Sequence, residues 1–256
     1  MTTLNVPVSG RWLARSRTAG DPRLRMICFP HVGGGGAAFH SWLDALPAGV
    51  ELCAIRLPGR ENRLHEPLLD DPDDLFAHLE PVLAPLSDLP FLLVGHCSGS
   101  VLAYEYARRL HAAGGPRPAM VVLSSTEAPP HRRVDDPLHL LPRDELLDRV
   151  IGYGGMAPEV LDDAGLMAIF ERILRADYRA VERLRYSAGP PLDAPITVIG
   201  GRHDRFTSRA AMAAWSEETT GEFSLHLLDA GHYLLREAGP RMADVARALL
   251  DGRARP

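Results

Sequence analysis

The segment Gly95-His96-Cys97-Ser98-Gly99 limits what this chain can fold into more than any other part of the sequence. It follows an apolar run from Phe91 to Val94. Glycines two residues before and two residues after Cys97 leave room for a sharp turn from strand to helix, which holds the central side chain at its tip. The segment therefore predicts a nucleophile elbow. Apolar residues then recur at helical spacing, at Ala103, Tyr106, Ala107 and Leu110.

A plainer interpretation of Cys97 is also open. Free cysteines are commonly small buried hydrophobic residues, and Ser98 or Ser100 could cap the helix that follows. A catalytic triad on a sheet of this kind runs along the chain in the order nucleophile, acid, histidine. The C-terminal third of the chain supplies an acid and a histidine in that order, which favours the catalytic interpretation.

Asp204 and His232 are the predicted acid and histidine. Asp204 follows the strand-like run Ile196 to Ile199, and His232 follows a second such run, Leu225 to Leu228. Catalytic groups collect at the carboxyl ends of strands in an open α/β sheet, so we expect both side chains at one edge. A surface aspartate and a solvated histidine are the plain alternatives. Two neighbouring residues fit the pattern less well, although the second stays open as the acid: His203 and Asp229.

Short apolar runs alternate with helical segments along the chain, which predicts an α/β fold with a mostly parallel sheet flanked by helices. Strand signals are missing over residues 127–189, where Leu146 to Ile151 and Leu166 to Leu174 show helical spacing. We expect a single domain, residues 1–256. The expected strands are Met26–Phe29, Val50–Ile55, Phe91–Val94, Met120–Ser124, Ile196–Ile199 and Leu225–Leu228.

Composition argues against several classes of function. No stretch reaches the roughly 18 apolar residues of a membrane helix, and the polar start lacks the apolar core of a signal peptide, so we expect a cytoplasmic protein without membrane contact. All 28 basic residues are arginine, and the formal net charge of −5 argues against nucleic-acid binding, which needs a concentrated positive field. The 3 cysteines, Cys28, Cys53 and Cys97, have neither metal-ligand spacing nor the even number of a disulfide framework, so no metal is expected.

A run of glycines, Gly33 to Gly36, follows the first predicted strand. A phosphate-binding P-loop would need Gly-Lys-Ser/Thr at its end, and the chain contains no lysine. The run fits an oxyanion loop better, with the backbone N–H groups of Val32 and Ser98 facing a developing negative charge. His31 is expected to order this loop, and His96 to have a structural role.

Several segments together resemble the type II thioesterases of polyketide and nonribosomal peptide pathways, within the α/β-hydrolase superfamily. The resemblance covers nearly the whole chain and implies an α/β-hydrolase fold, with residues 127–189 as a helical lid over the active site; extra helical packing on the sheet is the alternative. Most members carry serine where this chain has Cys97. Besides the elbow, the segments are Phe29 to Gly34, Leu57 to Arg63, Leu174 to Tyr178, Gly200 to Asp204 and Gly231 to Tyr233.

The resemblance also implies the partner, which is an acyl or peptidyl carrier protein. The substrate would be carried on the phosphopantetheine of that partner, so no cofactor of the chain's own is expected. A monomer is favoured. Carrier proteins of this class are acidic, and arginines grip carboxylates through paired hydrogen bonds. We therefore predict docking through a local patch near the lid and the oxyanion loop, formed by Arg60, Arg63, Arg132 and Arg133.

Cysteine at the nucleophile position leaves two reactions open. Attack of Cys97 on an acyl thioester would release the pantetheine thiol and leave a second thioester of nearly equal energy on the enzyme. Water would then complete a thioesterase reaction, whereas a second carrier thiol, an amine or a hydroxyl would complete an acyl transfer. A noncatalytic module that only binds carrier proteins is the third possibility, and the candidate triad weighs against it.

Overall fold

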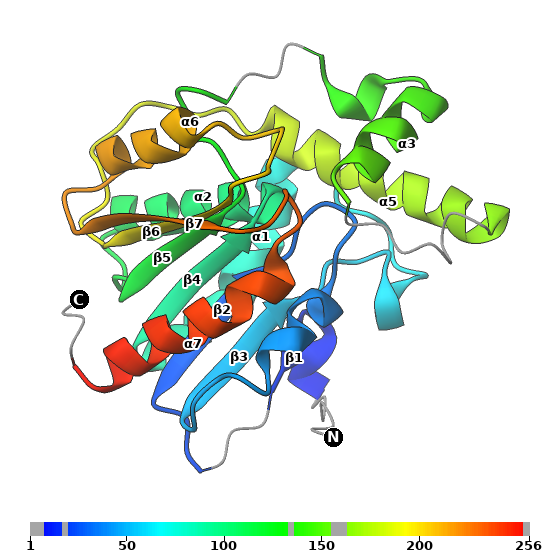
Figure 1. Ribbon diagram of the computed structural model, residues 1–256. Helices are drawn as coiled ribbons and strands as arrows, with labels where there is room; N and C mark the ends of the chain where they lie inside the picture. Colours follow the sequence, from blue (N-terminus) through cyan, green and yellow to red (C-terminus); the bar gives the residue numbers. More distant parts are fainter. Residues whose placement is uncertain (1–7, 17–19, 133–135, 155–162, 253–256) are drawn as a thin grey trace.

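A single sheet forms the centre of the computed structural model, which describes residues 8–16, 20–132, 136–154 and 163–252 (Figure 1). Its strands are β1 (Leu13–Arg15), β2 (Leu24–Phe29), β3 (Val50–Ile55), β4 (Phe91–His96), β5 (Met120–Ser124), β6 (Ile196–Gly201) and β7 (Phe223–Leu228). In this described part, 7 strands pair in the order β1-β3-β2-β4-β5-β6-β7. β1 is antiparallel to β3 and all other neighbours are parallel, so the carboxyl ends of six consecutive strands in the sheet meet at one edge.

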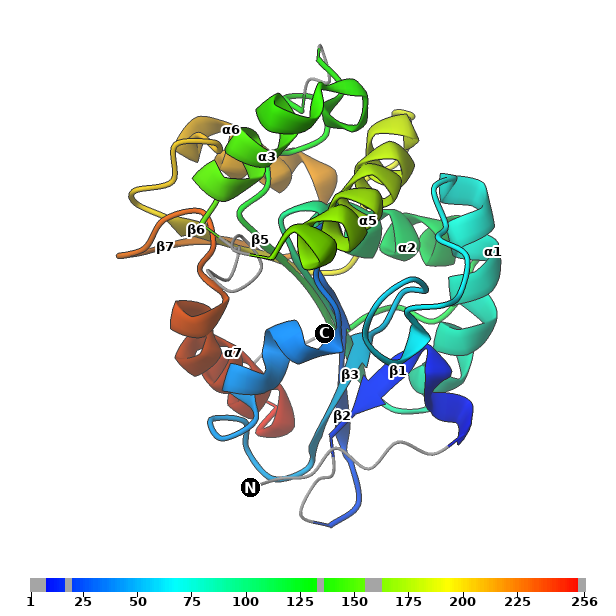
Figure 2. The same ribbon diagram turned by 90° about the vertical axis from the view of Figure 1, so that its right-hand side faces the viewer.

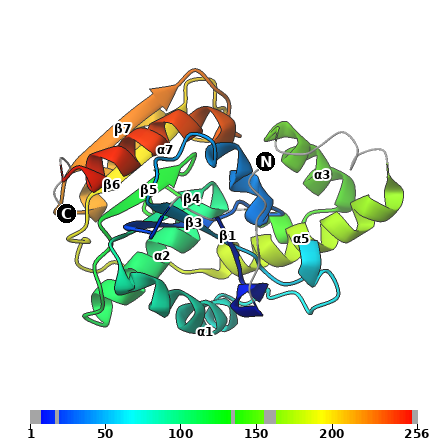
Figure 3. The ribbon, with the colours of Figure 1, turned by 90° about the horizontal axis from the view of Figure 1, so that it is seen from below.

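Helices cover both faces of the sheet, as Figures 2 and 3 show. Side chains alternate between the faces along a strand, so Ile27 enters the core on one face and Met26 the core on the other. Because both faces are buried, the strands read as nearly continuous apolar runs. One face is covered by α1 (Pro72–Leu83), α2 (Ser98–Ala112) and α6 (Arg209–Ala213), and the other by η2 (Gly36–Trp42) and α7 (Leu235–Leu250).

Short 3-10 helices connect these elements: η1 (Val8–Arg11), η3 (Glu61–Arg63), η4 (Ala84–Asp88), η5 (Leu138–Leu140) and η6 (Ala214–Glu218). Within the described residues, no helix combines the length and the apolar character needed to cross a membrane.

Among the described residues between β5 and β6 are the helices α3 (Arg143–Gly152) and α5 (Ala164–Arg183). In Figure 2 they lie together beyond the upper end of the sheet. Tyr178 of α5 packs with α3 side chains against Val32, which follows β2, so the insertion forms a small core of its own above the strand ends. The helical segment predicted within residues 127–189 is therefore present, while its role as a lid and the single-domain organisation stay predictions.

The α/β fold predicted from the sequence is confirmed, with small differences in strand limits. β3 and β5 have the predicted bounds; β2 and β7 begin earlier, and β4 and β6 run further, than the apolar runs indicate. β1 was not predicted. It has only 3 residues, and its antiparallel pairing, with Leu13 opposite Ile55, depends on contacts that no local pattern encodes.

Candidate active site

The nucleophile elbow forms between β4 and α2, as the sequence predicts. Cys97 has backbone angles φ 52° and ψ −120°, a strained combination that persists only where the surroundings hold it. Its N–H donates a 2.7 Å hydrogen bond to the carbonyl of Ser124 at the end of β5. A Cβ atom at Gly95 or Gly99 would lie 2.3 Å or 2.1 Å, respectively, from backbone atoms, so glycine is required on both sides. The elbow presents a half-buried Cys97 side chain at the edge of the sheet.

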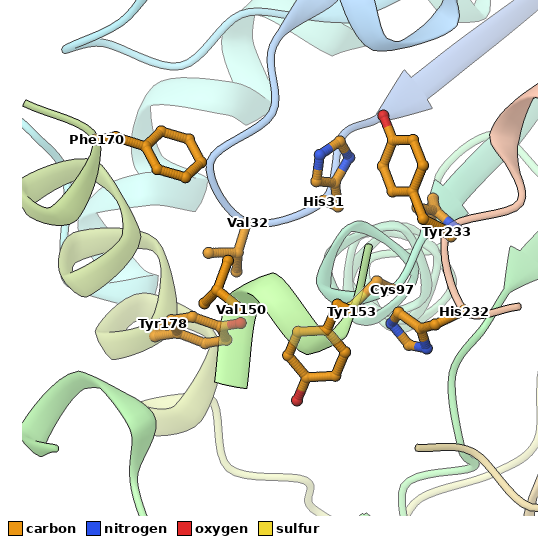
Figure 4. A pocket seen from close by; sticks show the side chains of 10 residues that line it. His31, Val32, Cys97, Val150, Tyr153, Phe170, Tyr178, His232 and Tyr233 are labelled. Carbon is orange, nitrogen blue, oxygen red and sulfur yellow. The ribbon is translucent and has the colours of Figure 1, made fainter. Parts of the chain in front are cut away.

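Asp204 and His232 meet at the same edge, on the loops after β6 and β7. His232 Nδ1 donates a 2.9 Å hydrogen bond to Asp204 Oδ2, and the two side chains are 6% and 0% exposed. Asp204 also accepts hydrogen bonds from the N–H of Phe206 at 2.8 Å and from the hydroxyl of Thr207 at 2.5 Å. These contacts orient the imidazole so that its Nε2, which has no hydrogen-bond partner among the described residues, lies on the side of Cys97 (Figure 4).

Hydrogen bonding outweighs the effect of burial on the pKa values of both His232 and Asp204. Burial alone would lower the pKa of His232, but the hydrogen bond to Asp204 and the neighbouring Cys97 raise this pKa to about 10. Burial alone would raise the pKa of Asp204, but the bonds from His232 and Thr207 lower it. The site therefore favours an ionised Asp204 and a protonated His232 at neutral pH.

His203 and Asp229 take no part in this arrangement. His203 Nε2 lies 2.7 Å from Asp229 Oδ1, and the two exposed side chains form a pair of their own. Because Asp204 contacts His232 directly, the geometry favours Asp204 over Asp229 as the acid.

Val32 and Ser98 supply the N–H groups of the predicted oxyanion hole. Ser98 is the first residue of α2, where N–H groups have no partner within the helix and the helix dipole favours negative charge. Among the described residues, neither the N–H of Val32 nor that of Ser98 donates a hydrogen bond to another backbone group. Both donors are thus available to a ligand, and the oxyanion hole stays a prediction.

A mostly apolar pocket lies over Cys97 (Figure 4). The ring of Tyr153, at the end of α3, lies with its centroid 4.8 Å from that of His232. Phe170 and Tyr178 line the pocket from α5. An acyl group bound to the sulfur would therefore contact both inserted helices.

The half-buried His31 and the buried His96 line the same pocket. Burial lowers the pKa of His31 to about 4 and that of His96 well below its ordinary value, so both are neutral. Both rings pack edge-on against Tyr233, at centroid distances of 4.9 and 5.4 Å, which supports the ordering and structural roles predicted for them. Despite these histidines, the described residues contain no group of three side chains that could hold a metal ion. That the protein needs no cofactor stays a prediction.

The predicted arginine patch is wrong for Arg60 and Arg63. Their side chains are only 6% and 4% exposed, and each forms an ion pair with a carboxylate of the protein. Arg132 is half-buried and donates hydrogen bonds to two carbonyls at the end of α5. Arg133 lies outside the described residues. Local sequence cannot reveal such burial, because the partner of Arg60 lies more than a hundred positions away, on α5.

Sequence reasoning missed two residues that hold the candidate triad. The Thr207 hydroxyl donates a hydrogen bond to Asp204. Asp204 also accepts hydrogen bonds from the backbone N–H groups of Phe206 and Thr207, two and three positions further along the chain. An aspartate that binds the backbone at this spacing is a recognisable turn signal in a sequence. Ser125 donates a 2.7 Å hydrogen bond from its hydroxyl to the carbonyl of His232 and has φ 48°. No local signal links Ser125 to His232, because the contact forms only when β5 and β7 join the same sheet.

A mostly parallel sheet between helices, with an elbow and a histidine–aspartate pair at its carboxyl edge, defines the α/β-hydrolase class. The model of the thioesterase domain matches residues 24–250, and the chain belongs to the thioesterase family.

Relatives in biosynthetic pathways agree with this assignment. The gramicidin S biosynthesis protein GrsT of Aneurinibacillus migulanus is 31% identical over 234 residues, which cover 91% of this chain and 91% of GrsT. The structure of the type II thioesterase BorB from the borrelidin cluster is 33% identical with a TM-score of 0.80, covering 93% of this chain and 96% of BorB. YbtT, a type II thioesterase from the yersiniabactin NRPS/PKS pathway, is 28% identical with a TM-score of 0.75, covering 93% and 94% of the two chains. The chain therefore has type II thioesterase homologues, while the use of cysteine as nucleophile stays a prediction.

Proposed function

We propose that the protein cleaves acyl or aminoacyl thioesters from the phosphopantetheine arm of a carrier protein, through an acyl-enzyme on Cys97. One observation carries the proposal: His232 is held by Asp204 with its Nε2 unpartnered on the side of a strained Cys97. A module that only bound carrier proteins would have no need of this arrangement. The chain's type II thioesterase homologues support the choice of substrate class.

The first half-reaction transfers the acyl group to sulfur. With the proton on His232, Cys97 attacks as a thiolate, and its sulfur forms a bond to the carbonyl carbon. The electrons of the C=O bond move to oxygen, where the N–H groups of Val32 and Ser98 stabilise the negative charge. When this intermediate collapses, the bond from carbon to the pantetheine sulfur breaks, and His232 gives its proton to the leaving thiolate.

The second half-reaction removes the acyl group. Neutral His232 takes a proton from water as the water oxygen attacks the acyl carbon. The bond to Cys97 then breaks, the free acid leaves, and the thiolate and the protonated imidazole are restored.

Acyl transfer is the second candidate, and the cysteine itself favours it. A serine ester would have a lower transfer potential than the carrier thioester, whereas the thioester on Cys97 keeps that potential. A second carrier thiol, an amine or a hydroxyl could then take the acyl group in place of water.

The partner in both reactions is an acyl or peptidyl carrier protein. It presents the thioester at the end of a long arm, so the chain itself needs only a pocket that receives the acyl group. The apolar pocket lined by Tyr153, Phe170 and Tyr178 fits this use.

Intact-protein mass spectrometry after mixing with acyl-loaded carriers tests the proposal and separates its two forms. We expect a mass increase equal to the acyl group. If hydrolysis is the function, this adduct is lost in buffer alone; if transfer is the function, it persists in buffer and is lost when an unloaded second carrier is added. The absence of both adduct and turnover with every loaded carrier would contradict the proposal.

A further inference from the structure

The oxyanion loop is held by a side chain from α5 rather than by the sheet alone. The N–H of Gly33, directly after Val32, donates a 2.8 Å hydrogen bond to Asp177 Oδ2. On the next residue, the carbonyl of Gly34 accepts a 2.9 Å hydrogen bond from Arg60 Nη1. Two consecutive residues of the loop, Gly33 and Gly34, are therefore hydrogen-bonded to side chains that lie far from them in the sequence.

Arg60 and Asp177 also bind each other through two parallel hydrogen bonds. Nη1 lies 2.7 Å from Oδ2 and Nη2 lies 2.6 Å from Oδ1, and each side chain is only 6% exposed. Such a bidentate pair has a fixed geometry, and in a buried setting loss of one partner leaves the other charge uncompensated. The pair is thus a rigid clamp, and its attachment to α5 ties the loop to that helix.

Packing of α5 on the loop reinforces the clamp. Gly33 has φ 77°, and a Cβ atom there would lie 2.8 Å from the ring of Phe170 and 3.1 Å from Leu174. Only a glycine fits under these two side chains in this backbone conformation. Val32 itself packs in the small core formed by α3 and α5.

From these contacts we infer that Asp177, held by Arg60, is a positioning residue that fixes the oxyanion loop from α5. The inference rests on the proposed function, in which the N–H of Val32 binds the oxyanion. Asp177 anchors the peptide group between Val32 and Gly33, so it limits rotation about the residue whose N–H must point at the oxygen. An oxyanion donor works only within about 2.7–3.1 Å of the oxygen, and small displacements are therefore costly.

Two reactions of Cys97 distinguish positioning from general damage. Acylation by a thioester needs both the thiolate and the oxyanion hole. Alkylation by iodoacetamide needs the thiolate, which displaces iodide from carbon, but forms no oxyanion. We expect Asp177→Asn to lower the rate of acylation on the order of 10- to 100-fold, less than the loss of a whole donor, and to leave the rate of alkylation unchanged.

Matched variants control for stability. Arg60→Met combined with Asp177→Leu removes the clamp without leaving a buried charge, and it should show the same selective loss of acylation. Glu51→Gln breaks a buried carboxylate–arginine contact on the sheet, far from the loop, and should leave both rates unchanged. Arg179→Ala breaks an ion pair with Asp70 on the outer face of α5 and should also leave the rates of acylation and alkylation unchanged.

The outcomes test the positioning role of Asp177 and the proposed function separately. Equal losses of acylation and alkylation in the clamp variants, or no loss of either, would overturn the positioning role. If the wild-type protein is alkylated at Cys97 but is never acylated by any loaded carrier, the proposed function itself fails.

Discussion

At the scale of single residues, the protonation of His232 decides how the nucleophile is activated. Its pKa is raised to about 10, so below that pH the imidazole carries a proton. A cysteine beside a protonated imidazole can react as a thiolate, because its thiol can transfer its proton to the imidazole. A serine hydroxyl, in contrast, is activated only by a neutral imidazole that can accept its proton. Cysteine and serine at position 97 should therefore respond to pH in opposite ways.

We expect acylation of the wild-type protein to fall as pH rises through about 10, where His232 loses the proton needed by the leaving thiol. Cys97→Ser should instead gain rate as pH rises, because its base must first be deprotonated. Stopped-flow acylation rates between neutral and alkaline pH would measure both profiles. Parallel profiles for the two proteins would contradict the proposed thiolate.

At the scale of elements, the elbow depends on the close approach of α2 to β2. A Cβ atom at Gly99 would lie 2.1 Å from the carbonyl oxygen of Phe29, so Gly99→Ala must push the helix away from the strand. We expect a loss of stability of about 3 kcal/mol together with a loss of acylation. Urea denaturation would measure the loss of stability.

Gly231→Ala is the matched control for this prediction. Gly231 precedes His232, yet a Cβ atom there would meet nothing within 4 Å, so the substitution should change neither stability nor acylation. An equal loss of stability in both variants would show that the elbow has no special requirement for glycine.

The elements also show how far sequence reasoning reaches. The elbow, the strands around it and the loops that carry Asp204 and His232 have local signals, because each depends on neighbouring residues. Arg60 and Asp177 stand in segments whose family resemblance is clear, but their contact with the oxyanion loop joins three distant parts of the chain. Their position could not be predicted, and Arg60 was accordingly expected on the surface.

At the scale of the whole molecule, the net charge of −5 disfavours contact with an acidic carrier unless local arginines offset it. With Arg60 and Arg63 buried, the proposed docking would have to use other, exposed arginines. We expect added salt to lower kcat/KM for a carrier-bound thioester and to leave a small pantetheine thioester nearly unaffected, because screening weakens contacts between exposed charges. Equal salt dependence for the two substrates would show that carrier charges contribute nothing to docking.

The most direct test of the account is to locate the acyl group. After brief reaction with a loaded carrier, peptide mapping by mass spectrometry should find the acyl group on Cys97, and Cys97→Ala should form no adduct. The His232→Ala variant should still be acylated on Cys97, but more slowly by about 10²-fold or more, because it lacks the imidazole that holds and transfers the proton. An acyl group mapped to Ser98, or undiminished turnover in Cys97→Ala, would contradict the central claim that Cys97 is the nucleophile.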